Sequence, residues 1–121
     1  MKEKIAISWK EYDDMIVQLT EKIKESKITF DGIYGIPRGG LVLAVSLSHQ
    51  LDLPLLIYPT KNTLVVDDIS DEGKTLSSLK NRKIATLYST SWTKIKPDWH
   101  IKEKTDKNTW LIFPWENQEK E

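Results

Sequence analysis

The spacing of apolar residues predicts three helices in this chain. Ser8, with Glu11 three residues later, forms a capping box, and apolar side chains then recur at helical spacing as far as Ile23. This pattern is typical of an amphipathic helix with one buried face. A second, strongly apolar helix follows a pair of glycines, and a short third helix ends near an asparagine. The expected helices are residues 9–25, 41–51 and 73–80.

Short apolar runs between the helices predict strands at residues 30–36, 54–58, 63–66, 83–88 and 110–113. Strands that alternate with helices indicate an α/β fold, with a mostly parallel twisted sheet flanked by helices. Only residues 59–62 separate the second strand from the third. A parallel crossover needs about a dozen residues. These two strands therefore cannot be adjacent and parallel, and we expect an antiparallel edge or shortened strands.

Composition narrows the possible classes of protein. The chain has 121 residues, 39% of them apolar and 30% charged, which suits one globular domain. Lys plus Arg and Asp plus Glu each number 18, a balance that does not favour a nucleic-acid binder. There is no cysteine, no apolar run near the ~20 residues of a membrane span, and no signal-like start. We expect a cytoplasmic domain with a core over about residues 8–90, a hood over 91–116 and a polar tail at 117–121.

The most informative polar segment follows the strand at residues 63–66. That strand runs directly into Asp67 and Asp68, and a polar turn from Asp71 to Thr75 comes next. Acidic groups and backbone N–H donors at one strand end can hold a sugar diol beside a phosphate. The Gly-Lys-Thr run is not a Walker A loop, because the first glycine of that motif would fall at Asp68. A solvated acidic turn explains poorly why two acids follow a buried strand.

A second loop, Gly-Ile-Pro-Arg-Gly-Gly at residues 35–40, joins a strand to a helix. It is not a dinucleotide-binding fingerprint, because Pro37 stands where that motif has its second glycine. Backbone N–H groups at a helix start and the guanidinium of Arg38 suit an anion. A plain strand-to-helix turn explains the same residues about equally well. Neither His49 nor His100 has a partner at metal-ligand spacing, so no protein zinc site is expected.

Together these segments resemble the type I phosphoribosyltransferases. The acidic turn resembles the family's signature for 5-phosphoribosyl pyrophosphate (PRPP), and residues 36–40 resemble its pyrophosphate loop. Residues 110–116 are similar to the base-binding end of the xanthine–guanine branch. The resemblance covers residues 8–116 and implies a purine salvage enzyme. Such an enzyme uses Mg²⁺, transfers the phosphoribosyl group of PRPP to guanine, xanthine or hypoxanthine, and releases pyrophosphate. It also implies a homo-oligomer, a dimer or tetramer, with no nucleic-acid or membrane partner.

The resemblance assigns a role to each candidate site residue. Asp67 and Asp68 would bind the ribose hydroxyls, and Asp71 would act as the general acid/base at the purine N7. Asp67, Asp68 and Glu116 would contact the metal indirectly, through PRPP or water. The remaining implied sites are Asp71, Glu72, Gly73, Lys74 and Thr75 for the 5-phosphate at a helix start, Arg38 and Gly39 for pyrophosphate, and Trp110 and Leu111 for the base.

Aromatic residues leave an alternative open. Trp110 is also compatible with core packing beside its apolar neighbours, although the Pro-Trp-Glu run that follows favours stacking on a base. Core or interface packing is expected for Trp9, Trp92 and Trp99. The resemblance also implies a strained or cis peptide bond before Arg38.

The chain departs from the family pattern at three places. Relatives have a closing loop of some twenty residues where this chain has only residues 59–62. Thr90 stands where relatives have a lysine that contacts the purine 6-oxygen, so that Lys94 or Lys96 would have to replace it. Glu72 replaces a threonine of the phosphate loop. A non-catalytic PRPP- or nucleotide-binding regulatory relative therefore remains an alternative, as does a scaffold that uses the tryptophan-rich residues 92–115.

Overall fold

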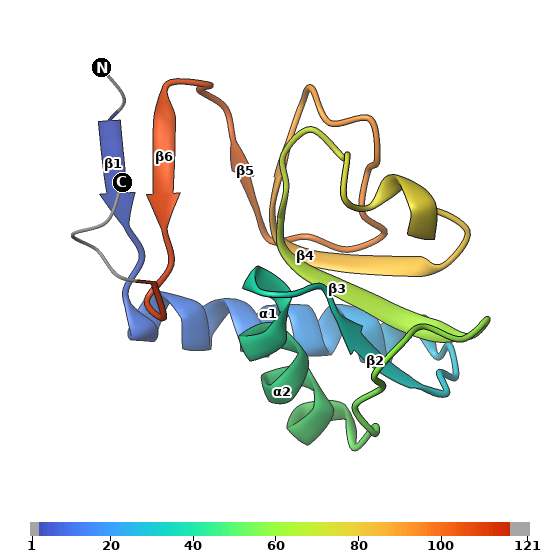
Figure 1. Cartoon of the computed structure of the whole chain (residues 1–121). Helices are drawn as coiled ribbons and strands as arrows, with labels where there is room; N and C mark the ends of the chain where they lie inside the picture. The colour runs from blue at the N-terminus through green and yellow to red at the C-terminus, as the bar shows by residue number, and fades with distance from the viewer. Residues whose placement is uncertain (1–2, 117–121) are drawn as a thin grey trace.

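The computed structural model describes residues 3–116 and has an α/β fold with two parallel sheets (Figure 1). The polar tail expected at residues 117–121 lies outside the described residues. In chain order the elements are β1 (Glu3–Ala6), α1 (Trp9–Ser26), β2 (Gly32–Gly35), α2 (Gly39–Leu51), β3 (Thr63–Ser70), the 3₁₀ turn η1 (Ser77–Leu79), β4 (Lys83–Thr90), β5 (Lys102–Lys104) and β6 (Thr109–Ile112). The larger sheet has the order β2-β3-β4-β5, and β1 pairs with β6 in a second sheet.

Helix α1 begins at the capping box that the sequence predicts. The Glu11 N–H donates to the Ser8 hydroxyl at 3.0 Å, and the Ser8 N–H donates to the Glu11 carboxylate at 3.1 Å. The helix ends at Lys27, which adopts the left-handed conformation with φ 58°. Both long helices are confirmed, and none in the described part of the chain is long and apolar enough to cross a bilayer.

The two faces of the larger sheet are covered differently. In the view of Figure 1, α1 and α2 lie below the strands, and the yellow segment that contains η1 lies above them. The main core, on the helical face, includes Ile33, Leu64, Val66, Ala85 and Leu87 from the strands and Leu19, Leu43 and Leu47 from the helices. On the other face, Val65 and Ile84 pack with Ile36, Leu76, Leu79 and Ile95. A short irregular segment, rather than a third helix, therefore closes the second face.

The strand expected at residues 54–58 is wrong as an element. Only Leu55 forms a bridge, which is parallel to Ile33 of β2. The Ile33 N–H donates to the Pro54 carbonyl at 2.9 Å, and the Leu56 N–H donates to the Ile33 carbonyl at 2.8 Å. The chain then leaves the sheet, and Ile57 is 91% exposed. The expected strand is thus reduced to a single bridge. A shortened strand is one of the two arrangements that the short link at residues 59–62 allows.

The helix expected at residues 73–80 is also wrong, because only the three-residue turn η1 forms there. Gly73 has φ +86°, which is incompatible with a right-handed helix. The Ser77 hydroxyl donates to the Lys74 carbonyl at 2.9 Å, a local bond that competes with helix formation. Leu76 is 1% exposed, so its burial against the sheet holds this segment in an irregular path.

Strand boundaries differ from the expected ones at the site. β3 continues to Ser70 because its pairing with β4 extends from Leu64, opposite Lys83, as far as Ser70, opposite Ser89. The two neighbouring acids therefore lie within a strand and not after it. β1 and β5 are unpredicted, since both are short and rich in charged residues.

The link at residues 59–62 is fixed at the start of β3. The Thr60 N–H donates to the Thr63 hydroxyl at 2.6 Å, and Nε of Arg82 donates to the Thr60 carbonyl at 2.7 Å. At about 3.3 Å per residue, the other end of this strand lies roughly 20 Å away. The link therefore does not cover the carboxyl ends of the strands.

Candidate functional site

Asp67 and Asp68 lie at the carboxyl end of β3, the edge of a parallel sheet where ligands usually bind. Both are partly buried, and their carboxylates are held by backbone donors. The Asp68 N–H donates to the Asp67 carboxylate at 2.9 Å, and the Ile69 N–H donates to the Asp68 carboxylate at 2.8 Å. The two carboxyl groups interact with each other, since each contributes to the shift in the other's pKa.

The pKa values of Asp67 and Asp68 are both raised above the usual value for an aspartate. Burial, followed by the charge of Asp68, raises the pKa of Asp67 to about 8. Burial also raises the pKa of Asp68, and the charge of Glu116 adds to that rise. A cation beside the pair would relieve this repulsion, so the donors suit a metal brought in by a ligand. Within residues 3–116 no three acidic or histidine side chains form a metal cluster of their own.

The phosphate loop, residues 71–75, follows these acids and surrounds a cavity of about 230 Å³ that Asp67 also lines. A Cβ on Gly73 would lie 2.8 Å from the Ile95 nitrogen, so a side chain there would clash with backbone. The Lys94 N–H donates to the Glu72 carbonyl at 3.2 Å. The loop is therefore shaped by the segment packed behind it. The helix start expected for the phosphate is absent, so the donors that the loop could offer to an anion are its backbone amides.

Glu72 is one of the residues that line this cavity, but its charge is paired with a neighbouring cation. Its carboxylate lies 3.1 Å from the Lys74 ammonium, and both side chains are largely exposed. The hydrogen bond from Lys74, and then the charge of Lys74, lower the pKa of Glu72. The Glu72 charge is thus directed to solvent and paired with a cation.

Asp71 is held by residues that sequence analysis did not assign to the site. Nε1 of Trp92 donates to one carboxylate oxygen at 3.1 Å, and the Lys104 ammonium lies 3.7 Å from the other. The Lys104 side chain is only 9% exposed. The Thr90 hydroxyl donates to the Asp71 carbonyl at 2.5 Å. The core or interface packing expected for Trp92 is therefore only part of its surroundings, because its polar edge belongs to the site.

The position of Lys104 follows from the register of the sheet. β5 pairs with β4 so that Lys104 lies opposite Thr90. Lys104, on the strand beside β4, is thus adjacent to Thr90, the position where the family pattern has a lysine. Lys94 and Lys96 line a different cavity, which opens at the start of β3 and β4. No sequence signal marks Lys104, since Lys-Glu-Lys is typical of a solvated segment.

The loop at residues 36–40 packs against the acidic pair. The peptide bond between Pro37 and Arg38 is cis, as the resemblance implies, and the Arg38 side chain is exposed. A Cβ on Gly39 would lie 2.3 Å from a carboxylate oxygen of Asp68, so only glycine allows this close approach. The Ile36 N–H donates to the Val66 carbonyl at 3.0 Å. Two segments far apart in sequence therefore meet at one strand end.

The aromatic end of the chain divides into a packed part and an exposed part. Trp115 stacks on Phe113, with ring centroids 5.1 Å apart and planes inclined by 11°. Trp110 lies on β6 and is 42% exposed, so the core alternative is wrong for it. Leu111 is half-buried beside it. The Glu116 carboxylate accepts the Phe113 N–H at 3.0 Å, which fixes it near the acidic pair.

Trp99 and Trp9 differ in how deeply they are buried. Trp99 meets Phe30 edge to face at 6.3 Å and packs against the main core, as predicted. Trp9 is 52% exposed, although it contacts the rings of Tyr12 and Trp115.

The raised pKa of Asp67 predicts that this residue destabilises the fold increasingly as pH rises above about 4. The folded chain holds a proton on Asp67 that the unfolded chain loses above pH 4, so stability falls as pH rises from about 4 to 8. We expect Asp67→Asn to raise the free energy of unfolding at pH 8 by about 1–3 kcal/mol, with little change at pH 4. Urea unfolding at both pH values measures this difference.

Asp13→Asn, on the exposed side of α1, is the matched control and should leave the pH dependence as in the wild type. If Asp67→Asn and the wild type lose stability in parallel between pH 4 and 8, the strained carboxylate pair is not present in solution.

No protein-family model matches the sequence. A purine phosphoribosyltransferase of known structure from Pyrococcus horikoshii is 34% identical, with a TM-score of 0.81 over 94% of this chain and 95% of that one. A xanthine-guanine-hypoxanthine phosphoribosyltransferase of Helicobacter pylori shares the fold, with a TM-score of 0.78, 21% identity and 92% of each chain covered. A xanthine-guanine phosphoribosyltransferase of Desulfotalea psychrophila is 28% identical, with 74% of this chain and 72% of the relative covered. The chain therefore belongs to the purine phosphoribosyltransferase family, with the type I fold.

Proposed function

We propose that this chain transfers the 5-phosphoribosyl group of PRPP to a 6-oxopurine base and releases pyrophosphate, as a Mg²⁺-dependent enzyme of purine salvage. One observation carries the proposal: the acidic pair, the phosphate loop and the loop at residues 36–40 meet at the carboxyl end of β3. In PRPP the ribose diol lies between the 5-phosphate and the pyrophosphate, just as the acidic pair lies between the phosphate loop and the loop at residues 36–40.

In the proposed reaction a purine nitrogen forms a bond to C1 of the ribose while the bond from C1 to the pyrophosphate oxygen breaks. Asp67 and Asp68 accept hydrogen bonds from the ribose hydroxyls, and their charge favours the positive character that develops on the sugar. Asp67 and Asp68 are the residues that would lie beside a Mg²⁺ ion brought in with PRPP, and such an ion would supply the counter-charge for both carboxylates and for the leaving pyrophosphate. Arg38 and the Gly39 N–H hold the departing pyrophosphate.

Asp71 takes up the proton that the purine N7 loses as the base becomes a nucleotide. Trp92 and Lys104 fix the two oxygens of its carboxylate, which limits its rotation in the absence of substrate. A fixed carboxylate avoids part of the reorganisation that proton transfer would otherwise require. Trp110, exposed on β6, offers an aromatic face for the base, and the Leu111 backbone offers polar groups for its edge.

Lys104 completes the base site in this proposal. Because it lies opposite Thr90, its ammonium reaches the region that a base above Asp71 would occupy. An ammonium donates to a carbonyl oxygen and repels an amino group. Lys104 therefore favours purines with a 6-oxygen over adenine.

One observation favours a non-catalytic binder of PRPP or a nucleotide instead. The link at residues 59–62 is short and is fixed at the far end of β3, so it does not act as a lid. A lid normally excludes water from a reactive sugar intermediate. A binder that lacks a lid would keep the acidic pair and the phosphate loop but perform no transfer.

Turnover with PRPP separates the two functions. We expect the wild type, with PRPP, Mg²⁺ and guanine, xanthine or hypoxanthine, to form a nucleoside monophosphate and an equal amount of pyrophosphate. Removal of the proton acceptor in Asp71→Asn should lower kcat by about 10²–10⁴-fold. Liquid chromatography measures the nucleotide, and a coupled assay measures the pyrophosphate.

Glu25→Gln, an exposed substitution on α1, is the control and should keep wild-type rates. If calorimetry detects PRPP binding but no base yields a product, the chain is the non-catalytic binder and not the transferase. If the wild type neither turns over nor binds PRPP, both functions are wrong.

Lys104→Met tests the base-site assignment separately. Loss of a charged hydrogen bond to the 6-oxygen should lower kcat/KM for guanine by roughly 10–100-fold, which is more than the effect on the Kd for ribose 5-phosphate of losing the ion pair with Asp71. Lys104→Arg should recover part of the loss, and the preference for guanine over adenine should fall in Lys104→Met. Unchanged base preference in a folded Lys104→Met variant would remove Lys104 from base recognition.

A further inference from the structure

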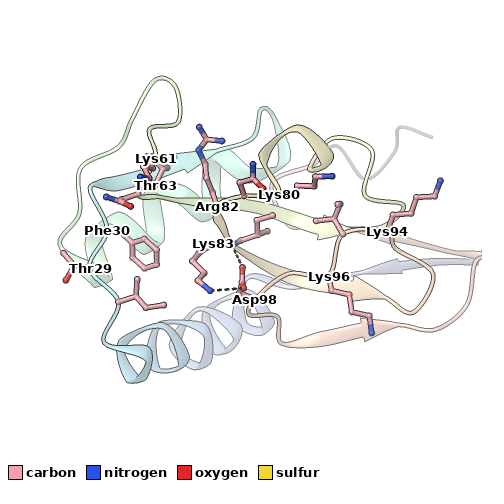
Figure 2. A pocket seen from close by; sticks show the side chains of 15 residues that line it. Thr29, Phe30, Lys61, Thr63, Lys80, Arg82, Lys83, Lys94, Lys96 and Asp98 are labelled. Atoms are coloured by element: carbon pink, nitrogen blue, oxygen red, sulfur yellow. Dashed lines mark hydrogen bonds and ion pairs between the residues drawn. The ribbon is translucent and has the colours of Figure 1, made fainter.

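A second cavity, of about 480 Å³, opens at the amino-terminal ends of β3 and β4, where Thr63 and Lys83 begin these strands (Figure 2). It is about twice the size of the cavity at the phosphate loop. Its volume falls in the range of about 300–1,000 Å³ that is usual for small-molecule sites. None of the residues assigned to phosphoribosyl transfer lines it.

Its lining is strongly basic. The cationic residues that line it are Lys61, Lys80, Arg82, Lys83, Lys94 and Lys96. Against these six stands one acid, Asp98, although the whole chain has 18 basic and 18 acidic residues. Such a cluster repels itself and raises the local concentration of anions. The cavity thus suits a ligand with several negative charges.

Asp98 does not neutralise the cluster. One of its carboxylate oxygens lies 3.6 Å from the Lys83 ammonium, and the other accepts the Ile84 N–H at 2.8 Å. Figure 2 shows these two interactions as dashed lines inside the cavity. Asp98 therefore fixes the wall and Lys83, and Nε of Arg82 is bonded to the Thr60 carbonyl. Four lysines of the lining, Lys61, Lys80, Lys94 and Lys96, remain for an anion.

The same cavity has an apolar wall. Ile28 is 41% exposed there and supplies most of the apolar surface, whereas Phe30 is 8% exposed and its ring is fixed edge to face on Trp99. An inorganic phosphate chain would leave this wall in contact with water, whereas a nucleobase would cover it. We propose that the cavity binds a nucleoside polyphosphate, with the phosphates among the lysines and the base against Ile28 and Phe30.

One wall of the cavity is also the support of the phosphate loop. Ile95, between Lys94 and Lys96, packs under Gly73, and its carbonyl accepts the Ser70 hydroxyl at 2.7 Å. The Lys94 N–H bonds to the loop. A ligand that orders this segment would therefore change the affinity of the loop for a 5-phosphate, and the coupling would be reciprocal. This coupling rests on the proposed function, whereas the binding itself does not.

Amide NMR of the whole ¹⁵N-labelled chain tests the binding. GTP, ATP and tripolyphosphate are titrated with ribose 5-phosphate in excess, so that the phosphate loop is occupied. We expect saturable shifts at residues 61–63, 82–84 and 94–96, with the nucleotides bound at least about tenfold more tightly than tripolyphosphate because the base buries apolar surface. Lys80→Glu/Lys96→Glu should weaken nucleotide binding by about tenfold or more.

The matched control is Lys22→Glu/Lys102→Glu, which makes the same charge change at exposed residues outside the cavity, and it should keep nearly wild-type affinity. Shifts confined to residues 71–75, or equal weakening in both variants, would overturn the proposal, and tripolyphosphate binding as tightly as GTP would overturn its nucleotide part. Failure of ribose 5-phosphate to shift residues 71–75 would count against the proposed function alone, because the two sets of amides are read separately.

Discussion

The site depends on two neighbouring carboxylates that are buried at the end of a parallel strand. Burial and mutual repulsion raise the pKa of Asp67 to about 8, so the ligand-free chain holds this pair at a cost. The cost is tolerated because the strand is fixed on both sides, by β2 and β4, and because Gly39 lets the loop after β2 lie directly on Asp68. A ligand that brings a cation and two hydroxyl groups relieves the strain, which couples binding to the ionisation of the pair.

The rest of the site is arranged around this strand end by packing. The phosphate loop is held from behind by Ile95, and Asp71 is held by Trp92 and Lys104. These supports come from residues 92–104, which lie well beyond the loop in sequence. They give the loop a defined shape without a helix behind it, so the proposed binding of a phosphate there relies on backbone amides and not on a helix dipole.

Much of this arrangement could be predicted from sequence, because the signals are local. The capping box at Ser8 marked the start of α1, and the two acids after an apolar run marked the site. The wrong predictions depend on tertiary contacts. The residue types at positions 73–80 favour a helix, but the positive φ of Gly73 and the burial of Leu76 prevent one. Lys104 and the basic cavity arise from strand register and from the meeting of distant segments, which no local pattern encodes.

The most direct test of the central claim is a crystal structure of the chain with guanosine 5′-monophosphate and Mg²⁺. We expect the 5′-phosphate on the amides of residues 71–75, the ribose hydroxyls on Asp67 and Asp68, and the base against Trp110. A nucleotide whose phosphate lies away from residues 71–75, with Asp67 and Asp68 making no contact to the ribose, would contradict it.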